Sequence, residues 1–431
     1  MRCAERVSFG AVLLVCFGCL ATLPSSAQTP RGTEFRVNNT ITANKDRPKV
    51  TVSRGGNFQV VWQAGAFPDQ NIFSRRFSST GAALTNDVAV NLQTLSGQQD
   101  YPNAGSLNSN GAFVVVWRTS LASTQSEDSI NAKMYDSNGT QFGGPNLSDE
   151  FLVDAYTSSG VVRGQTAVAG DAGGNFVAVW SGPIQGSCCN GGIAGRRFNS
   201  SGTALGGNFA VAAQPNGIIF LHPSIAMAPS GNFVVTWDAA GYPAEQYEIV
   251  GQRFSSSGAA LGGTFKVNSY TTNRQSYSSV GSDASGNFVV VWTSGDNYTG
   301  TLNGQRYKSD GTLLGGEFQV SGTAKKGPTG VGRHPSGAFV ATWFDGFEIF
   351  ARVYSSAGAP TGSEFRVNSY TTFNQYRTSV GIDDAGQFTV AWVSQTNTGI
   401  ATPGVYAQRY CMDGILVTPP NAVVVTQTVC Q

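Results

Sequence analysis

The residues of this chain that could do acid–base or metal chemistry are few and scattered. The 431 residues include two histidines, His222 and His334. His222 stands at the start of a predicted strand and His334 in a predicted turn, so we expect the two rings at opposite faces of the fold. That separation argues against a His-based metal site and against a Ser-His-Asp triad. The sequence also contains no Asp-x-Asp-x-Asp-Gly calcium loop. We therefore predict no metal and no cofactor.

Paired carboxylates are the other catalytic option, because glycoside cleavage commonly uses two of them. Glu245 and Glu248 fall in one predicted loop. The chain has only 26 acidic residues, and nothing in the sequence predicts that these two are buried. We expect them to belong to a solvated loop and assign no catalytic residue.

Tyrosines beside Asn and Asp in predicted loops are better candidates for ligand binding, since exposed Tyr suits contact with carbohydrate or protein. The loops after seven recurring tryptophans vary most in length, and length variation on one face of a repeat array often marks a binding face. The alternative is that these loops are merely solvated. The candidates are Arg118, Asp238, Tyr242, Tyr247, Asp296, Tyr298 and Asp345, with Tyr270 and Tyr370 from the links between repeats.

An internal repeat must position these loops. The pattern Gly-x-Phe-x-x-x-Trp occurs seven times and contains every tryptophan of the chain: Trp62, Trp117, Trp180, Trp237, Trp292, Trp343 and Trp392. Successive tryptophans are separated by 55, 63, 57, 55, 51 and 49 residues. Each repeat holds four short runs with strand patterning and no run with helical period. In the fifth repeat these runs are 279–282, 288–292, 302–307 and 317–320.

Four strands per repeat and seven repeats predict an all-β fold, a seven-bladed β-propeller of four-stranded antiparallel blades. The alternative is a β-solenoid, whose coils are usually shorter. A Glu-Phe-x-Val-Asn-like run also occurs seven times, and its first copy precedes the first tryptophan. We therefore expect residues 34–38 to complete the last blade, 377–412, and close the ring, with the first blade at 48–91. The domains expected are a signal peptide (1–27), a linker (28–33), the propeller (34–412) and a C-terminal tail (413–431).

Two repeated residue types are predicted to be structural. The tryptophans end the most apolar run of each repeat, where we expect blades to pack against each other. A basic residue recurs near the aromatic of the third run, and such residues more often stack or pair within a sheet than bind substrate. The basic residues are Arg76, Lys133, Arg197, Arg253, Arg306, Arg352 and Arg409.

The repeat resembles those of secreted and surface proteins of bacteria. The resemblance rests on Gly315-Gly-Glu-Phe-Gln-Val320, Gly286-Asn-Phe-Val-Val-Val-Trp292 and Gly251-Gln-Arg-Phe254, and it covers residues 34–412. It implies a repeat-built extracellular protein and brings no established activity or catalytic residue.

The N-terminus has the pattern of a secretory signal peptide. Arg2 and Arg6 precede an apolar stretch, Val7–Leu23, and small residues precede an expected cut before Gln28. A membrane anchor is the alternative, but the stretch is at the short limit for crossing a bilayer. We expect an exported protein, found in the periplasm, at the cell surface or outside the cell.

If the protein is exported, its cysteines are expected to form disulfides, because an oxidising compartment favours them. We predict a Cys411–Cys430 disulfide, and closing a loop of that size is worth about 3 kcal/mol in the chain-entropy model. The adjacent Cys188 and Cys189 form either a vicinal disulfide or bonds between molecules.

Composition excludes several partners. The chain carries 27 basic and 26 acidic residues, a formal charge of +1, so it lacks the basic surface that nucleic acids or anionic membranes require. With 40% hydrophobic residues it can build a core. We expect a monomeric, secreted, non-enzymatic binding propeller that recognises glycan or protein through its variable-loop face. The alternatives are a secreted hydrolase or lyase that uses loop carboxylates, and a structural module of an envelope or matrix.

Overall fold

The computed structural model describes residues 28, 30–40, 43–66, 69–91, 97–107, 110–121, 128–144, 150–154, 163–183, 191–213, 219–241, 247–295, 300–322, 327–395 and 403–412. Throughout these ranges the regular elements are β-strands. A search of the same ranges finds no helix with the length and apolar character needed to cross a membrane.

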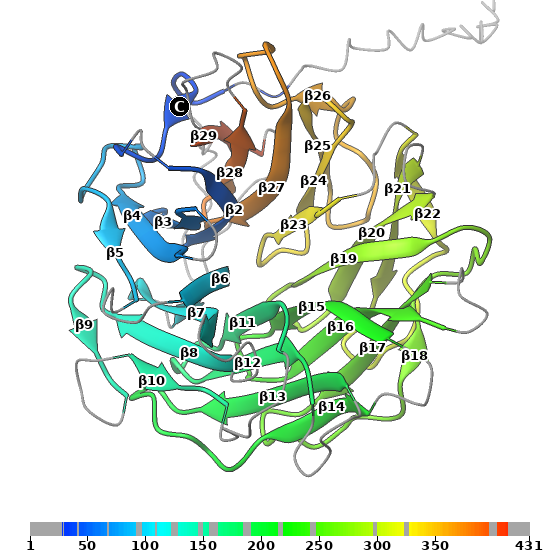
Figure 1. Ribbon diagram of the computed structural model, residues 1–431. Helices are drawn as coiled ribbons and strands as arrows, with labels where there is room; N and C mark the ends of the chain where they lie inside the picture. Colours follow the sequence, from blue (N-terminus) through cyan, green and yellow to red (C-terminus); the bar gives the residue numbers. More distant parts are fainter. Residues whose placement is uncertain are drawn as a thin grey trace, which may run out of the picture.

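The strands form seven antiparallel sheets set around a central axis like the blades of a propeller (Figure 1). The predicted seven-bladed β-propeller is confirmed, and the β-solenoid alternative is wrong. The strand nearest the axis opens each blade. We number the blades one to seven by these inner strands, which are β2 (Lys45–Val52), β6 (Gly97–Leu107), β11 (Thr166–Gly170), β15 (Ile219–Met227), β19 (Gln275–Ser282), β23 (Gly330–Arg333) and β27 (Gln375–Ile382).

Three more strands follow outward in each blade. The second strands are β3 (Phe58–Ala64), β7 (Ala112–Leu121), β12 (Phe176–Ser181), β16 (Phe233–Ala240), β20 (Phe288–Gly295), β24 (Phe339–Phe344) and β28 (Gln387–Ser394). The third strands are β4 (Asn71–Phe77), β8 (Asp128–Tyr135), β13 (Gly192–Phe198), β17 (Tyr247–Phe254), β21 (Gly300–Tyr307), β25 (Ile349–Tyr354) and β29 (Gly404–Cys411). The outer strands are β5 (Val88–Ala89), β10 (Phe151–Leu152), β14 (Phe209–Ala213), β18 (Phe265–Lys266), β22 (Phe318–Ser321) and β26 (Phe365–Arg366), and blade two adds β9 (Gln141–Phe142) beside β8.

The N-terminal strand β1 (Phe35–Arg36) is the outer strand of blade seven, as predicted. Phe35 pairs with Ala407 of β29, and the Val37 amide donates to the Val405 carbonyl at 2.8 Å. The pairing continues upstream, because the Arg31 amide donates to the Arg409 carbonyl at 2.8 Å. Part of the segment predicted as a linker therefore also lies along β29, and the two ends of the ring are joined so that β29 is not left as an unpaired edge.

Aromatic residues fill the space between blades. All seven tryptophans are at most 1% exposed, so their predicted core role is confirmed. In each blade a second-strand Phe stacks on the aromatic residue opposite it in the third strand, as Phe288 does on Tyr307 with ring centroids 4.7 Å apart. Cross-strand aromatic pairs of this kind stabilise a sheet beyond the area that they bury.

The repeated basic residues hold neighbouring blades together, as the predicted structural role requires. Arg253 of blade four donates to the Ser309 carbonyl, in the outer turn of blade five, at 2.9 Å. Arg76, Arg197, Arg306 and Arg409 make the same contact to the next blade, and Arg409 reaches from blade seven to blade one. Lys133 and Arg352 instead donate to carbonyls of the preceding blade's outer segment.

Candidate functional site

The inner strands are interrupted by a β-bulge in blades one, two, four, five and seven. In blade one the pairing of β2 with β3 passes from Asp46 opposite Gln63 to Lys49 opposite Val61. The two bulge residues, Arg47 and Pro48, therefore oppose a single residue, which is Trp62. The other four bulges have the same register, so the repeated tryptophan marks the position behind each bulge.

The first residue of each of these bulges has a left-handed backbone although it is not glycine. The five residues, which we call the bulge ring, are Arg47 (φ 55°), Tyr101 (φ 51°), His222 (φ 52°), Tyr277 (φ 58°) and Arg377 (φ 58°). Positive φ is costly for large side chains and persists where the surroundings enforce it, typically at functional sites. This left-handed conformation recurs at one structural position in five blades. We therefore infer that the surface formed by the five bulges has a specialised role.

Neighbouring blades enforce this backbone. The Tyr277 amide of blade five donates to Asp238 Oδ2 of blade four at 2.8 Å, and the His222 amide donates to Gln165 Oε1 of blade three at 2.8 Å. The Tyr101 amide likewise donates to Gln63 of blade one at 3.2 Å. Three of the five bulge residues, Tyr277, His222 and Tyr101, are thus held by the blade before them without any ligand.

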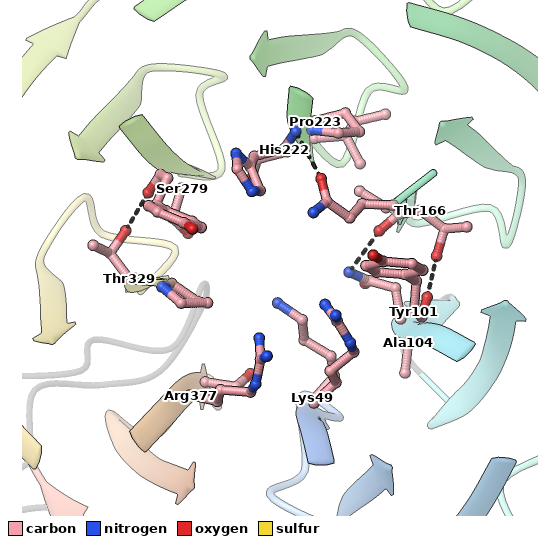
Figure 2. Close-up of a pocket in the computed structure, with 18 of the residues that line it drawn as sticks. Lys49, Tyr101, Ala104, Thr166, His222, Pro223, Ser279, Thr329 and Arg377 are labelled. Carbon is pink, nitrogen blue, oxygen red and sulfur yellow. Dashed lines mark hydrogen bonds between the residues drawn. The ribbon is translucent and has the colours of Figure 1, made fainter. Parts of the chain in front are cut away.

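The bulge ring surrounds a cavity of about 380 Å³ at the propeller axis. Figure 2 shows His222, Tyr101, Lys49 and Arg377 directed toward the centre from different blades. Serine, threonine and asparagine side chains complete the polar part of the wall, and valines contribute to its apolar part. Among the described residues that line the cavity, none is aspartate or glutamate.

Three cations face this space: Arg47, Lys49 and Arg377. Asp46 contacts two of them, with its carboxylate 2.5 Å from Arg377 Nε and 3.9 Å from Arg47 Nε. Arg47 also lies over the Tyr101 ring, 3.9 Å from its centroid. Lys49 has no carboxylate partner within the described part of the chain. Its burial, with the neighbouring charges of Arg47 and Arg377, lowers the pKa of Lys49 from 10.5 to about 8.

Arg118, one of the predicted loop contacts, instead belongs to a buried ion cluster next to Tyr101. Arg118 is bound by Asp100 at 2.6 Å and lies 3.6 Å from Asp128. Burial raises the pKa of Asp100, and the hydrogen bond from Arg118 opposes that rise. The Arg118 charge is neutralised by two acids, so its role here is to support Tyr101, whose ring centroid is 5.0 Å from the guanidinium carbon.

His222 is oriented by a buried carboxylate. Its Nδ1 lies 2.7 Å from Asp238 Oδ2, and Asp238 is 0% exposed. A carboxylate at Nδ1 accepts that nitrogen's proton, so the neutral ring presents the lone pair of Nε2. Among the described residues Nε2 has no hydrogen-bond partner. The Tyr277 ring lies against the imidazole, with centroids 4.1 Å apart. His334 is elsewhere, bound to Ser336 and to the Asp384 carbonyl in the turn beyond β23.

The prediction that Arg118 and Asp238 lie in loops is wrong. In blades two and four the second strand continues beyond its tryptophan. It does so because the inner strand still pairs with it on the far side of the bulge. Arg118 pairs with Asp100, and Asp238 pairs with Leu221. Both residues therefore lie inside blades and support the bulge ring from behind.

The remaining predicted contacts are not brought together with this cavity. Tyr247 starts β17 and carries Arg274 over its ring at 3.5 Å. Asp345 caps a turn by accepting from the Phe347 and Glu348 amides. Tyr270 and Tyr370 lie in the links, 50% and 45% exposed. Tyr242, Asp296 and Tyr298 lie outside the described residues.

Of the predicted carboxylate pair and the predicted disulfide cysteines, Glu248 and Cys411 lie among the described residues. Glu248 forms an ion pair with Lys266, whereas Glu245 lies outside the described residues. Over the described ranges no group of three or more His, Cys, Asp or Glu side chains gathers as a metal site would require. Cys411 is disulfide-bonded. Cys188, Cys189 and Cys430 lie outside the described residues, so the Cys411–Cys430 pairing and the state of the adjacent pair stay predictions.

The bulge ring was missed from the sequence, although a signal for it exists. Its members stand 15 residues before the tryptophan of their blade, or 16 in blade two. Proline follows the bulge residue at Pro48, Pro102 and Pro223, where a residue without an amide hydrogen suits an unpaired position. Aligning the repeats on tryptophan and reading back to this position would have collected Arg, Tyr, Gln, His, Tyr, Pro and Arg in blade order.

No protein-family model matches the chain, and no curated protein matches it. Solved structures do share its fold. A protein of unknown function from Dyadobacter fermentans is 10% identical, with a TM-score of 0.53 and coverage of 90% of this chain and 100% of its own. A fungal alcohol oxidase solved with copper is 12% identical, with a TM-score of 0.51 and coverage of 90% and 76%. An α-L-arabinanase of Penicillium chrysogenum, complexed with arabinobiose, is 11% identical, with a TM-score of 0.49 and coverage of 87% and 97%. The first two likenesses show the fold alone.

Proposed function

We propose that this chain is an exported glycan-binding propeller whose central cavity receives a carboxylated sugar unit. The observation that carries the proposal is Lys49. It lines the cavity together with Arg47 and Arg377, whose charges act on it, and it has no carboxylate partner among the described residues. Folding around such a cation is unfavourable unless a ligand compensates, and perturbed groups of this kind concentrate at functional sites.

The ligand must bring negative charge to the axis. Asp46 partly satisfies Arg377 and Arg47, but the cavity wall holds no described acid that reaches Lys49. A carboxylate on a ligand can form charge-assisted hydrogen bonds with Lys49 and with a guanidinium at once. These bonds form in a partly dehydrated space, where they are stronger than on an open surface.

The rest of the wall suits a sugar ring. The Tyr277 and His222 rings line the wall, where the C–H groups of a pyranose can pack against them, while Ser279 and Thr329 offer polar groups for hydroxyls. A cavity of about 380 Å³ is at the small end of ligand sites and suits one or two sugar rings. The same end of the strands leads into the variable loops, so a longer glycan would continue over the loop face.

Calorimetric titration with a trimer of galacturonic acid and with the matched neutral galactose trimer tests the proposal. The acidic trimer should bind to the wild-type protein, and its affinity should fall as salt is added. Lys49→Met keeps the aliphatic stem and removes the charge. It should weaken binding of the acidic trimer roughly tenfold to a hundredfold, the range for loss of a charged hydrogen bond.

Lys308→Met is the matched control, because Lys308 is exposed on the outer edge of blade five. It should leave the affinity unchanged. Equal affinity for the neutral trimer, or equal loss in the two lysine variants, would refute an anionic subsite at the axis.

A further inference from the structure

We propose that His222 is a catalytic base and that the cavity cleaves uronate-containing glycans by β-elimination; this inference rests on the proposed binding of a carboxylated sugar. The structure joins three features around one cavity: a buried Asp238 that orients the imidazole, an Nε2 atom with no hydrogen-bond partner among the described residues, and cations on the facing side. Figure 2 shows Lys49 and Arg377 approaching the centre from the side opposite His222.

Carboxylate-based hydrolysis does not fit this cavity. Hydrolysis of glycosides commonly uses two carboxyl groups that flank the bond. No described lining residue is acidic, and the nearby Asp100, Asp238 and Asp128 are each at most 5% exposed. The more exposed Asp46 is held in ion pairs by Arg377 and Arg47. The described groups that could move a proton at the cavity are His222, Tyr101, Tyr277 and Lys49. Elimination needs a base, a proton donor and positive charge for the substrate carboxylate, and this set supplies all three.

The contacts of His222 suit it to act as the base. The Asp238 carboxylate fixes the tautomer with the proton on Nδ1, and it also accepts from the Tyr277 amide, which fixes the neighbouring ring. The Asp238 carboxylate can stabilise the imidazolium that forms once Nε2 has taken a proton. Of the two histidines, His222 alone lines this cavity.

Lys49 and Arg377 would make the C5 proton of a bound uronate easier for the base to remove. The hydrogen on C5 of a uronate is adjacent to the carboxylate, and its loss places negative charge on that group. Cations that bind the carboxylate neutralise it and stabilise the charge that develops, which is the strongest general contribution to such a step. Their position across the cavity lets them hold the carboxylate while His222 addresses C5.

Tyr277 supplies the proton for the leaving oxygen. Burial, followed by the charge of Asp238, raises the pKa of Tyr277, so its hydroxyl stays protonated near neutral pH. Its ring lies against the His222 ring, with centroids 4.1 Å apart. That proximity lets the imidazolium return its proton to the tyrosinate after each turnover, directly or through one water.

The step balances as follows. His222 Nε2 takes the C5 proton, and the C5–H electron pair becomes the C4=C5 double bond. The C4–O4 bond breaks, and its electron pair leaves with O4, which remains attached to the anomeric carbon of the neighbouring sugar. O4 takes a proton from the Tyr277 hydroxyl. The products are a 4,5-unsaturated uronate and a new reducing end, with no water consumed and no redox change.

Incubation of the full protein with polygalacturonate, hyaluronan and alginate tests this step, because each contains uronate linked through O4. Wild-type protein should release fragments that absorb in the ultraviolet through the conjugated double bond. Mass spectrometry should find them lighter by one water than hydrolytic fragments. His222→Gln should lower kcat by about a thousandfold, and Tyr277→Phe by about a hundredfold, in the range for loss of general acid–base catalysis.

His334→Gln is the matched control and should keep wild-type kcat, since His334 lies outside the cavity. Thermal unfolding and calorimetric binding of the same polymers are measured for every variant. Tyr277→Phe preserves the ring contact and gives a second test should His222→Gln fold poorly. Binding of a polymer by wild-type protein without unsaturated fragments, or equal activity of the His222 and His334 variants, overturns the catalytic inference and leaves the proposed binding function standing. Absence of binding to all three polymers overturns the proposed function and the inference together.

Discussion

Replacing Lys49 by methionine should stabilise the protein while it weakens ligand binding. The pKa of Lys49 falls from 10.5 to about 8, chiefly through burial and then through Arg47 and Arg377. A shift of that size corresponds to about 3 kcal/mol of unfavourable free energy for holding the charge in the folded state. Since the side chain is only partly buried, this figure is an upper limit.

The sign of the pH dependence follows from the direction of the shift. A lysine whose pKa is lower in the folded state destabilises the fold below that pKa, and the penalty disappears as pH rises from about 8 toward 10.5. The stability gained by Lys49→Met should therefore be largest at pH 7, up to about 3 kcal/mol, and fall below about 1 kcal/mol at pH 10.

Urea unfolding of wild-type and Lys49→Met protein at both pH values measures this difference, and the other titrating groups cancel because the two proteins share them. Lys308→Met, on the outer edge of blade five, should show no such gain at either pH. A Lys49→Met variant that is less stable than wild type at pH 7, or a difference that does not shrink at pH 10, would refute the description of Lys49 as an uncompensated cation.

Two further predictions concern the ring itself. Deleting residues 34–38 removes β1 and exposes the edge of β29, and it takes away Phe35 and the fully buried Val37. Burial of each such side chain contributes about 2 kcal/mol, so the melting temperature by circular dichroism should fall sharply, and an unchanged value would contradict the closure. Arg253→Ala removes the contact from blade four to the Ser309 carbonyl of blade five and should cost about 1 kcal/mol in urea unfolding; a loss above that of a buried core truncation would contradict its role as a single interblade bond.

The fold could be predicted because its signal is repeated and local. The apolar run that ends at each tryptophan is buried in every blade, and a pattern that must satisfy the same packing seven times tolerates little change. The closure by residues 34–38 followed from counting, since the outer-strand run precedes the first tryptophan and has no copy after the last. Strand ends were less predictable. Asp238 stays paired with Leu221 beyond Trp237, because the bulge in β15 keeps the two strands side by side.

The site could not be predicted in the same way, because its signal lies in position and not in residue type. Arg47, Tyr101 and His222 share a backbone conformation and a place at the axis, yet their side chains have little in common. Large side chains avoid positive φ, so residue type alone does not predict this backbone conformation at these positions. The tryptophan recurs in all seven blades and the bulge in five, while the bulge residue itself varies from blade to blade. That variation builds one asymmetric cavity from similar blades.

The structure of the protein with bound digalacturonate tests the central claim most directly. We predict one sugar ring within the bulge ring at the axis, with its carboxylate in salt-bridge contact with Lys49 Nζ and with a guanidinium of Arg47 or Arg377. A disaccharide bound only at the outer loops, around Tyr270 or Tyr370, or an axial sugar whose carboxylate points away from Lys49, would contradict it.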